Sequence, residues 1–390
     1  MTVSRGDALA LTRALVRIDS RNPSLAPGAP GEGPIARALA DVLRAWGFAV
    51  EVHDAAPNRP NVVARVGPAG GRTLMFNGHL DVVGTDGMTH AAFAADERDG
   101  SLWGRGSSDM KGGVAAMCAA AARASDRGLD CEVIITAVAD EEWDSAGTRA
   151  VIARGVRADA AIVTEPTRLA IAPAHRGFAW TTVTIRGRAA HGSRYDVGID
   201  AIRHAGLLLA ELDALESREL AARTHPLLGR ASWHASTIDG GLGMSTYPDK
   251  CTLRIERRTL PGETPAQAFA EVRDACARVH ARRPSFDADV TLDLAQNPSD
   301  VATDAPVVRR LERALAASGE TSRIEGLSAW TDAALLNEAG IPAICYGPGD
   351  IARAHAAAEW IEVDEIERAT RVLTALAQSW AHTEEPAWRT

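Results

Sequence analysis

The feature that most constrains the fold is an arrangement repeated three times in the first half of the chain. Three apolar, strand-like segments, Thr73–Asn77, Glu132–Ala139 and Ala160–Thr164, each run directly into acidic residues or a histidine. The residues that follow these segments are His79 and Asp81, then Asp140, Glu141 and Glu142, and then Glu165. Helix-like segments between them predict a mostly parallel sheet covered by helices. Because the carboxyl ends of parallel strands meet at one edge, we expect these polar side chains to lie together there.

Helix and strand patterns alternate on both sides of a middle region that has a different order. Helices are predicted over 7–18, 34–46 and 110–124, and the alternation resumes over 306–380. The middle region predicts strands over 178–185, 233–238, 250–260 and 286–294, with helices over 199–221 and 265–282. This β-α-β-β-α-β order is typical of a ferredoxin-like α+β unit. The sequence therefore predicts a discontinuous α/β domain, residues 1–176 and 292–390, with an inserted α+β domain, residues 177–291.

Bringing several carboxylates to one edge is unfavourable, because like charges raise one another's pKa and reduce stability. A bound cation removes this conflict, and histidine and carboxylate ligands suit zinc or a similar divalent ion. A fourth acid, Asp109, follows the glycine-rich Gly104-Arg105-Gly106 segment and precedes the alanine-rich helix. Taken alone, Asp109 is explained as a helix N-cap. Taken with the strand ends, it is a candidate metal ligand.

The charge balance excludes several classes of function. The chain has 42 Lys and Arg against 51 Asp and Glu, a net charge of −9 at pH 7. A nucleic-acid binder or a polybasic membrane anchor would carry a positive surplus, so neither partner is expected. The most apolar stretch, 112–122, is shorter than the roughly 20 residues of a membrane span. Five widely spaced cysteines without a C-x-x-C pair indicate a reducing, cytoplasmic setting.

Five motifs in chain order resemble the zinc-dependent M20 peptidase and deacylase family. They are His79-Leu80-Asp81, the segment from Gly104 through Asp109 to Gly113, Asp140-Glu141-Glu142, Glu165-Pro166 and His355. That family includes acetylornithine deacetylase, succinyl-diaminopimelate desuccinylase, aminoacylase-1 and the glutamate carboxypeptidases. The resemblance covers essentially the whole chain, including the inserted domain.

The resemblance implies a centre with two zinc ions, for which cobalt or manganese are the expected substitutes. Asp109 would bridge the ions, His79 and Glu165 would bind one, and Glu142 and His355 the other. Glu141 would be the general base. Asp81 would orient the His79 imidazole through its other ring nitrogen. Taken singly, these residues also have structural explanations: a buried His79–Asp81 pair, and a solvated turn at Glu141 and Glu142.

The resemblance also places substrate-side residues, most of them in the insertion. His191 would stabilise the oxyanion, in this family typically in the partner subunit's site, although a loop histidine is the structural alternative. Arg258 would hold a substrate carboxylate, with neighbouring Arg257 as the alternative. Gly347 and Gly349 would line the carboxylate end through backbone N–H groups. Ser245 stands where many relatives carry Asn, which leaves its substrate contact open.

The implied function is hydrolysis of the amide bond of a small N-acyl amino acid with a free carboxylate, by a homodimer paired through the insertion. A carboxypeptidase or dipeptidase of the same family is the main alternative. A catalytically silent metal-binding or ligand-binding relative is disfavoured because Glu141 is intact. A two-metal phosphoesterase is disfavoured because the sequence has no phosphate-binding loop.

Overall fold

The computed structural model describes residues 2–382 of the chain, which divides into two compact units. The first unit comprises Met1–Pro173, Val301–Glu325 and Thr331–Thr390. The second comprises Ala174–Asp300 and Gly326–Trp330. The first unit is therefore discontinuous in sequence, and the second is formed almost entirely by one inserted segment.

The first unit contains a mixed sheet with a parallel centre. Its strand order is β1-β2-β6-β3-β7-β17-β8, and β16 also pairs with β8. The bounds are β1 Ala49–Ala56, β2 Arg59–Val66, β3 Thr73–His79, β6 Glu132–Val138, β7 Ala160–Val163, β8 Ile171–His175, β16 Ile324–Leu327 and β17 Ala343–Cys345. The four central strands β6, β3, β7 and β17 are parallel. This confirms the predicted parallel sheet, while β1, β2 and β8 pair antiparallel.

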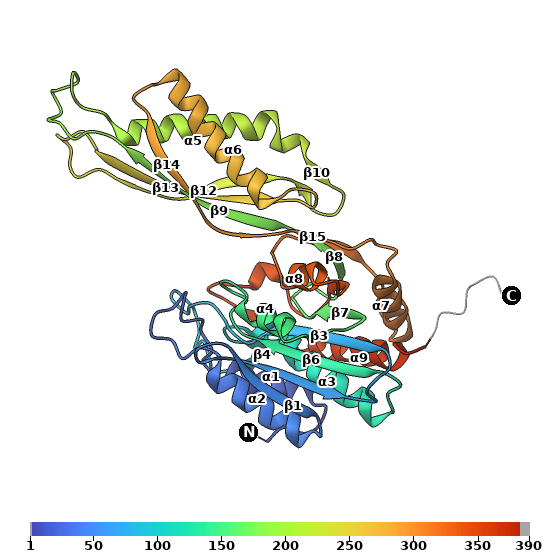
Figure 1. Ribbon diagram of the computed structural model, residues 1–390. Helices are drawn as coiled ribbons and strands as arrows, with labels where there is room; N and C mark the ends of the chain where they lie inside the picture. The colour runs from blue at the N-terminus through green and yellow to red at the C-terminus, as the bar shows by residue number, and fades with distance from the viewer. Residues whose placement is uncertain (1, 383–390) are drawn as a thin grey trace. The chain divides into compact units, whose positions relative to one another are not determined.

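Helices cover both faces of this sheet (Figure 1). One apolar core holds side chains from α1 Ala8–Val16, α2 Gly33–Ala45, α3 Gly112–Asp126, α7 Pro306–Ala317 and α9 Val363–Ser379. The sheet contributes alternate residues to it, such as Leu74 and Phe76 of β3, as a strand with two faces must. The short helices α4 Ala146–Ala153 and α8 Ala333–Glu338 contact each other and strands of the sheet. Figure 1 shows them on the other face.

A small three-stranded sheet brings together segments that are far apart in sequence. Its strands are β4 Asp96–Arg98, β5 Ser101–Trp103 and β18 Trp360–Glu362. The short helical turn η1, Ser107–Lys111, follows β5, and η3, Ile351–Arg353, precedes β18. The pairing of β18 with β5 therefore holds the chain just before Asp109 close to the chain just after His355.

The second unit has the predicted β-α-β-β-α-β order. Its elements are β9 Gly177–Arg186, α5 Ala201–Arg218, β12 Ser232–Gly240, β13 Lys250–Thr259, α6 Pro265–Arg282 and β14 Asp287–Gln296. The strand order is β12-β13-β9-β14, all antiparallel, as in a ferredoxin-like sheet. Its core joins α5 and α6 to residues such as Val183 and Leu253. The smaller elements are η2 Leu220–Ala222, β10 Thr224–His225, β11 Gly229–Arg230 and β15 Ser299–Asp300.

Helix ends follow local capping chemistry. Helix α5 begins at Ala201, two residues later than predicted, because the Asp200 side chain accepts a hydrogen bond from the backbone N–H of Arg203. Helix α6 begins with a capping box between Thr264 and Gln267. Strand β8 was not predicted, since Pro173 lies inside it. No helix within residues 2–382 is long and apolar enough to cross a membrane. All five cysteines are buried and free.

Glycine allows helix α3 to pack closely against the end of β7. A Cβ atom added to Gly113 would overlap the backbone carbonyl of Thr164. Gly206, inside helix α5, has no heavy atom within 4 Å of the same position. Gly113 is therefore a closely packed, buried helical glycine, whereas Gly206 is an exposed one with free space around it.

We predict that Gly113→Ala lowers the free energy of unfolding by about 1–3 kcal/mol through overpacking. Gly206→Ala is expected to raise it by about 0.5–1 kcal/mol, because alanine has the higher helix propensity. Urea unfolding followed by circular dichroism measures both. A Gly113→Ala protein as stable as the wild type would contradict the close-packing explanation.

Candidate metal centre

Five predicted ligands form two groups that share Asp109. The potential ligand atoms of His79, Asp109 and Glu165 all lie within 4.8 Å of one another. The same is true of Asp109, Glu142 and His355. His79 ends β3, Glu142 and Glu165 follow β6 and β7, Asp109 lies in η1, and His355 lies between η3 and β18. The carboxyl edge of the parallel strands thus supplies three of the five residues, and loops supply the other two.

The two carboxylate oxygens of Asp109 face different groups. His79 Nε2 lies 3.0 Å from Asp109 Oδ1 and 4.0 Å from Glu165 Oε1. His355 Nε2 lies 3.4 Å from Asp109 Oδ2 and 2.9 Å from Glu142 Oε2. A carboxylate placed between two histidine–glutamate pairs is the geometry that a bridging ligand requires.

Burial and mutual repulsion perturb the acid groups. Burial raises the pKa of Glu165 well above its ordinary value, and the nearby Asp109 carboxylate adds to the shift. Burial and Asp109 likewise raise the pKa of Glu142. Burial alone would raise the pKa of Asp109, but hydrogen bonds from His355 and His79 lower it. Burial lowers the pKa of His355, but its carboxylate partners Asp109 and Glu142 outweigh burial and raise this pKa to about 11.

The donor set fits divalent cations. Glu142 Oε1 is buried and has no hydrogen-bond partner among the described residues, so one strong acceptor is left unsatisfied. Each group offers one imidazole and two carboxylates, which suits zinc and related ions. Cation binding would compete with protonation of these ligands.

Glu141 belongs to neither group, although it lies beside them. Its Oε2 is 3.9 Å from His79 Nε2, and its side chain is almost buried. Burial raises the pKa of Glu141 well above its ordinary value, although the nearby His79 opposes the shift. The preceding residue, Asp140, has φ +70°, in the left-handed region. This tight turn after β6 lets neighbouring glutamates point in different directions.

Asp81 contacts His79 differently from the prediction. His79 Nδ1 donates to the backbone carbonyl of Asp81 at 2.9 Å, whereas the Asp81 carboxylate lies 3.7 Å away. That carboxylate instead accepts hydrogen bonds from the backbone N–H groups of Glu141 and Glu142, both at 3.2 Å. The predicted orientation of the imidazole thus comes from the backbone, and the side chain fixes the Glu141–Glu142 turn.

A buried polar network behind this turn was missed by sequence reasoning. Asn22 Nδ2 donates to Asp81 at 2.8 Å and to Asp140 at 3.0 Å. Arg59 pairs with Asp140 and with the fully buried Glu32. Glu32 also accepts a hydrogen bond from the backbone N–H of Asp140 at 3.1 Å. The only sequence signal was Asp140 itself, the first acid of the acidic triplet after β6.

Gly347 and Gly349 lie in the first unit, and their N–H groups are already bonded. Gly347 N donates to Thr167 Oγ1 at 3.1 Å, and Gly349 N donates to Glu365 Oε2 at 2.7 Å. A Cβ atom on Gly347 would overlap the backbone carbonyls of Thr164 and Glu165. Close packing beside Glu165 therefore accounts for Gly347, and a left-handed backbone with φ +91° accounts for Gly349. Contacts of their N–H groups with substrate remain a prediction.

The second unit brings His191 and Ser245 together. Their loops are joined by hydrogen bonds from Gly192 N to the Ser245 carbonyl, at 2.7 Å, and from Tyr247 N to the Ala190 carbonyl, at 2.9 Å. Both residues are exposed. His191 Nδ1 lies 2.9 Å from Ser193 Oγ.

The structure separates the two candidate arginines. Arg257 is buried and donates to Glu263 at 2.7 Å and to Glu271 at 2.9 Å. Arg258 lies on the opposite face of β13, as strand alternation requires. It donates to Glu256 at 3.2 Å and to the backbone carbonyl of Ser328 at 2.6 Å, and it lies over the ring of Phe178. Arg257 is thus committed to internal ion pairs, and Arg258 is the arginine on the face that the helices do not cover.

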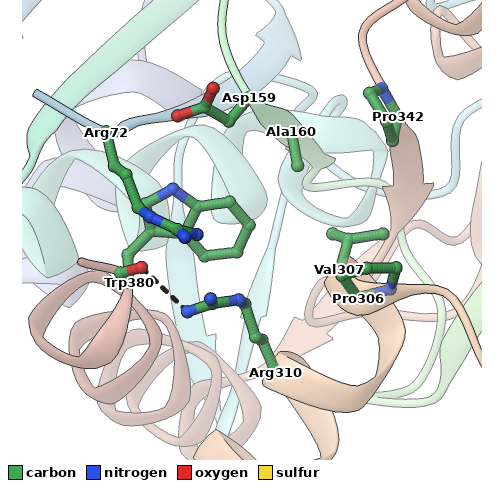
Figure 2. A pocket seen from close by; sticks show the side chains of 8 residues that line it. All are labelled: Arg72, Asp159, Ala160, Pro306, Val307, Arg310, Pro342 and Trp380. Atoms are coloured by element: carbon green, nitrogen blue, oxygen red, sulfur yellow. Dashed lines mark hydrogen bonds between the residues drawn. The ribbon is translucent and has the colours of Figure 1, made fainter. Parts of the chain in front are cut away.

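A cavity of about 410 Å³ in the first unit contains none of the predicted site residues. Figure 2 shows its lining of Arg72, Asp159, Ala160, Pro306, Val307, Arg310, Pro342 and Trp380. Ala160 begins β7, and Arg72 and Pro342 immediately precede β3 and β17. The cavity therefore lies at the amino ends of the parallel strands, the edge opposite to the two ligand groups.

Two curated proteins are similar to this chain over most of its length. An acetylornithine deacetylase from Myxococcus xanthus is 32% identical over 354 residues, which cover 87% of this chain and 89% of that protein. N-formyl-4-amino-5-aminomethyl-2-methylpyrimidine deformylase from Bacillus subtilis (strain 168) is 28% identical, with 91% of each chain covered.

The fold is also shared with solved structures. The YxeP protein of Bacillus subtilis, described as a dinuclear metal-binding peptidase, has a TM-score of 0.72 and 17% identity, covering 95% or more of each chain. The sequence profile of peptidase family M20/M25/M40 matches residues 75–379, which confirms the predicted resemblance. The chain therefore belongs to peptidase family M20/M25/M40, and it is a metal-dependent hydrolase of amide bonds.

Proposed function

We propose that this protein removes a small acyl group from the nitrogen of an amino acid or a similar carboxylate-bearing molecule. The observation that carries the proposal is the pair of histidine–carboxylate groups sharing Asp109, with Glu141 beside them but outside both. The two ligand groups would bind two metal ions, and the additional carboxylate of Glu141 would accept a proton. A catalytically silent metal-binding protein would not need the latter.

The proposed ligands of two zinc ions are Asp109 as the bridge, His79 with Glu165, and Glu142 with His355. Two divalent ions, when bound, lower the pKa of water and polarise a carbonyl group. The chain's own residues supply the rest. Glu141 accepts the proton of the attacking water and passes it to the leaving nitrogen. Asp81 holds the Glu141–Glu142 turn in place through two backbone hydrogen bonds.

Recognition of the substrate is proposed to come from the second unit. Arg258 would bind the free carboxylate, since it lies on the face of β13 that the helices do not cover, whereas Arg257 is held by Glu263 and Glu271. His191 would stabilise the oxyanion in the partner subunit's site of a homodimer. Its exposure in an isolated chain is consistent with a role across subunits. Ser245 would contact the substrate from the adjoining loop.

Two relatives favour a small acyl group, because their names specify removal of acetyl and formyl groups from nitrogen. A panel of N-formyl, N-acetyl, N-succinyl and long-chain N-acyl amino acids, with N-acetylornithine and simple dipeptides beside them, tests the proposal on zinc-loaded enzyme. We expect the highest kcat/KM for formyl or acetyl compounds. A preference for dipeptides would contradict the proposed substrate class and indicate a dipeptidase, and hydrolysis of phosphate esters alone would contradict amide hydrolysis altogether.

The Glu141→Gln variant tests the general base. We expect kcat to fall by about 10²–10⁴-fold, because Gln cannot accept a proton, while both zinc ions remain bound. The adjacent Glu142→Gln variant is the matched control, since it makes the same change in a proposed ligand and should lose zinc. Steady-state kinetics and zinc content measure the two effects. Wild-type turnover in Glu141→Gln would refute the assignment of Glu141.

Metal removal should inactivate the enzyme and lower its stability. Zinc at about 100 times its Kd stabilises a folded state by about 2.7 kcal/mol, so chelation should lower the unfolding midpoint and zinc should restore it. The His355→Asn variant should bind one zinc ion per chain instead of two. Asn suits this position because His355 has φ +61°, where Asn is tolerated. Retention of two tightly bound ions would exclude His355 as a ligand.

The His191→Ala variant tests catalysis across subunits. We expect kcat to fall while zinc content stays unchanged, because His191 is outside the ligand set. Mixing this variant with Glu141→Gln protein should recover part of the activity if one subunit supplies the base and the other the histidine. Absence of recovery in verified heterodimers would show that His191 does not act in the partner's site.

A further inference from the structure

Glu359 is a fully buried carboxylate outside the proposed ligand set, four residues after His355. Each of its two carboxylate oxygens accepts two hydrogen bonds. Oε1 accepts from the backbone N–H groups of Ser108, at 3.1 Å, and Asp109, at 3.2 Å. Oε2 accepts from the backbone N–H of Gly106, at 3.0 Å, and from Arg105 Nη1, at 2.7 Å. One side chain thus binds almost the entire loop that leads to Asp109.

These contacts offset part of the cost of burying a charge. An isolated buried carboxylate is strongly unfavourable, whereas an arginine and three backbone N–H partners stabilise the charged form. Burial still raises the pKa of Glu359, although the hydrogen bond from Gly106 and the charge of Arg105 oppose the shift. Arg105 is itself buried and also donates through Nε to the carbonyl of Gly84, at 3.0 Å. Arg105 therefore holds the Glu359 carboxylate and is itself held by the carbonyl of Gly84.

Glu359 also connects the two loops that carry the non-strand ligands. Its backbone carbonyl accepts a hydrogen bond from Gly104 N at 3.2 Å. Within its own loop, the carbonyl of Ala357 accepts from Thr89 N at 2.9 Å, and His355 takes a left-handed backbone conformation. The loop of Asp109 and the loop of His355 are consequently held together by both the main chain and the side chain of one residue.

We propose that Glu359 is a positioning residue that holds Asp109 and His355 at the separation required for two metal ions to share Asp109. The inference rests on the ligand set of the proposed function. Asp109 contributes to both ions, so displacement of its backbone should weaken both sites together. By contrast, loss of His355 removes a ligand from only one of them.

The Glu359→Gln variant separates charge from shape. A glutamine amide has one accepting oxygen and one donating nitrogen, so in either orientation its NH₂ group faces two N–H donors. The Glu359→Asp variant keeps the charge but is one methylene shorter, so it cannot contact all four donors. We expect both variants to lower the affinity for both zinc ions, by about 10–100-fold for Glu359→Gln and less for Glu359→Asp.

The matched control is Glu263→Gln in the second unit. Glu263 also accepts from an arginine, Arg257 at 2.7 Å, and from a loop N–H, that of Leu260 at 2.8 Å. This control should lower stability in a similar way while leaving both zinc affinities at wild-type values. It therefore distinguishes positioning of a ligand from loss of a buried ion pair in general.

The experiment measures zinc affinity and stoichiometry by competition with a chromophoric chelator, with thermal unfolding of the apo-proteins alongside. Parallel weakening of both ions in Glu359→Gln, partial rescue in Glu359→Asp and no change in Glu263→Gln are the expected results. Wild-type zinc affinity in Glu359→Gln, loss of one ion only, or failure of both Glu359 variants to fold would overturn the inference. If the wild-type chain itself does not bind two ions, the proposed function fails instead.

Discussion

The repulsion between buried carboxylates is the main constraint on the carboxyl edge of the sheet in the first unit. Asp109, Glu142 and Glu165 converge with Glu141 where water is largely excluded, and burial raises the pKa of each of the three glutamates. Two imidazoles compensate only part of this charge. Such a cluster is stable without protonation only when cations are bound among its members. Metal binding and the stability of this unit are therefore expected to be linked.

Hydrogen bonding distinguishes the carboxylates that support the site from those that face one another. The carboxylates of Asp81, Asp140, Glu32 and Glu359 accept from backbone N–H groups, amides or guanidinium groups. Glu142, by contrast, has a buried oxygen with no partner among the described residues, and its other oxygen meets only a histidine. The unsatisfied oxygen of Glu142 is consistent with the ligand role proposed for it, whereas the four saturated carboxylates support the surrounding chain.

Sequence reasoning reached the strand ends because their signal is local. An apolar run followed by an acid predicts both the strand and the position of the acid at its carboxyl end, and Glu165 and Glu142 lie there as predicted. The supporting contacts are not local. Asn22 is 59 residues from Asp81, and Glu359 is 250 residues from Asp109. Strand alternation separated Arg257 from Arg258 only once the register of β13 and its packing against α6 were known. No periodic pattern contains such information.

The proposed function divides the chemistry between the two units in a way that explains how relatives can differ in substrate. Every proposed metal ligand, and Glu141, belongs to the first unit, whereas Arg258, His191 and Ser245 belong to the second. Changes in the second unit can therefore alter the group that is recognised while leaving the ligand geometry intact. A sequence change near Asp109 would disturb the ligand geometry, because the loop of Asp109 is fixed by Arg105, Glu359 and the close packing of Gly113. Sequence differences that change the substrate should accordingly be found in the second unit, on its exposed loops and on the face of its sheet that the helices do not cover.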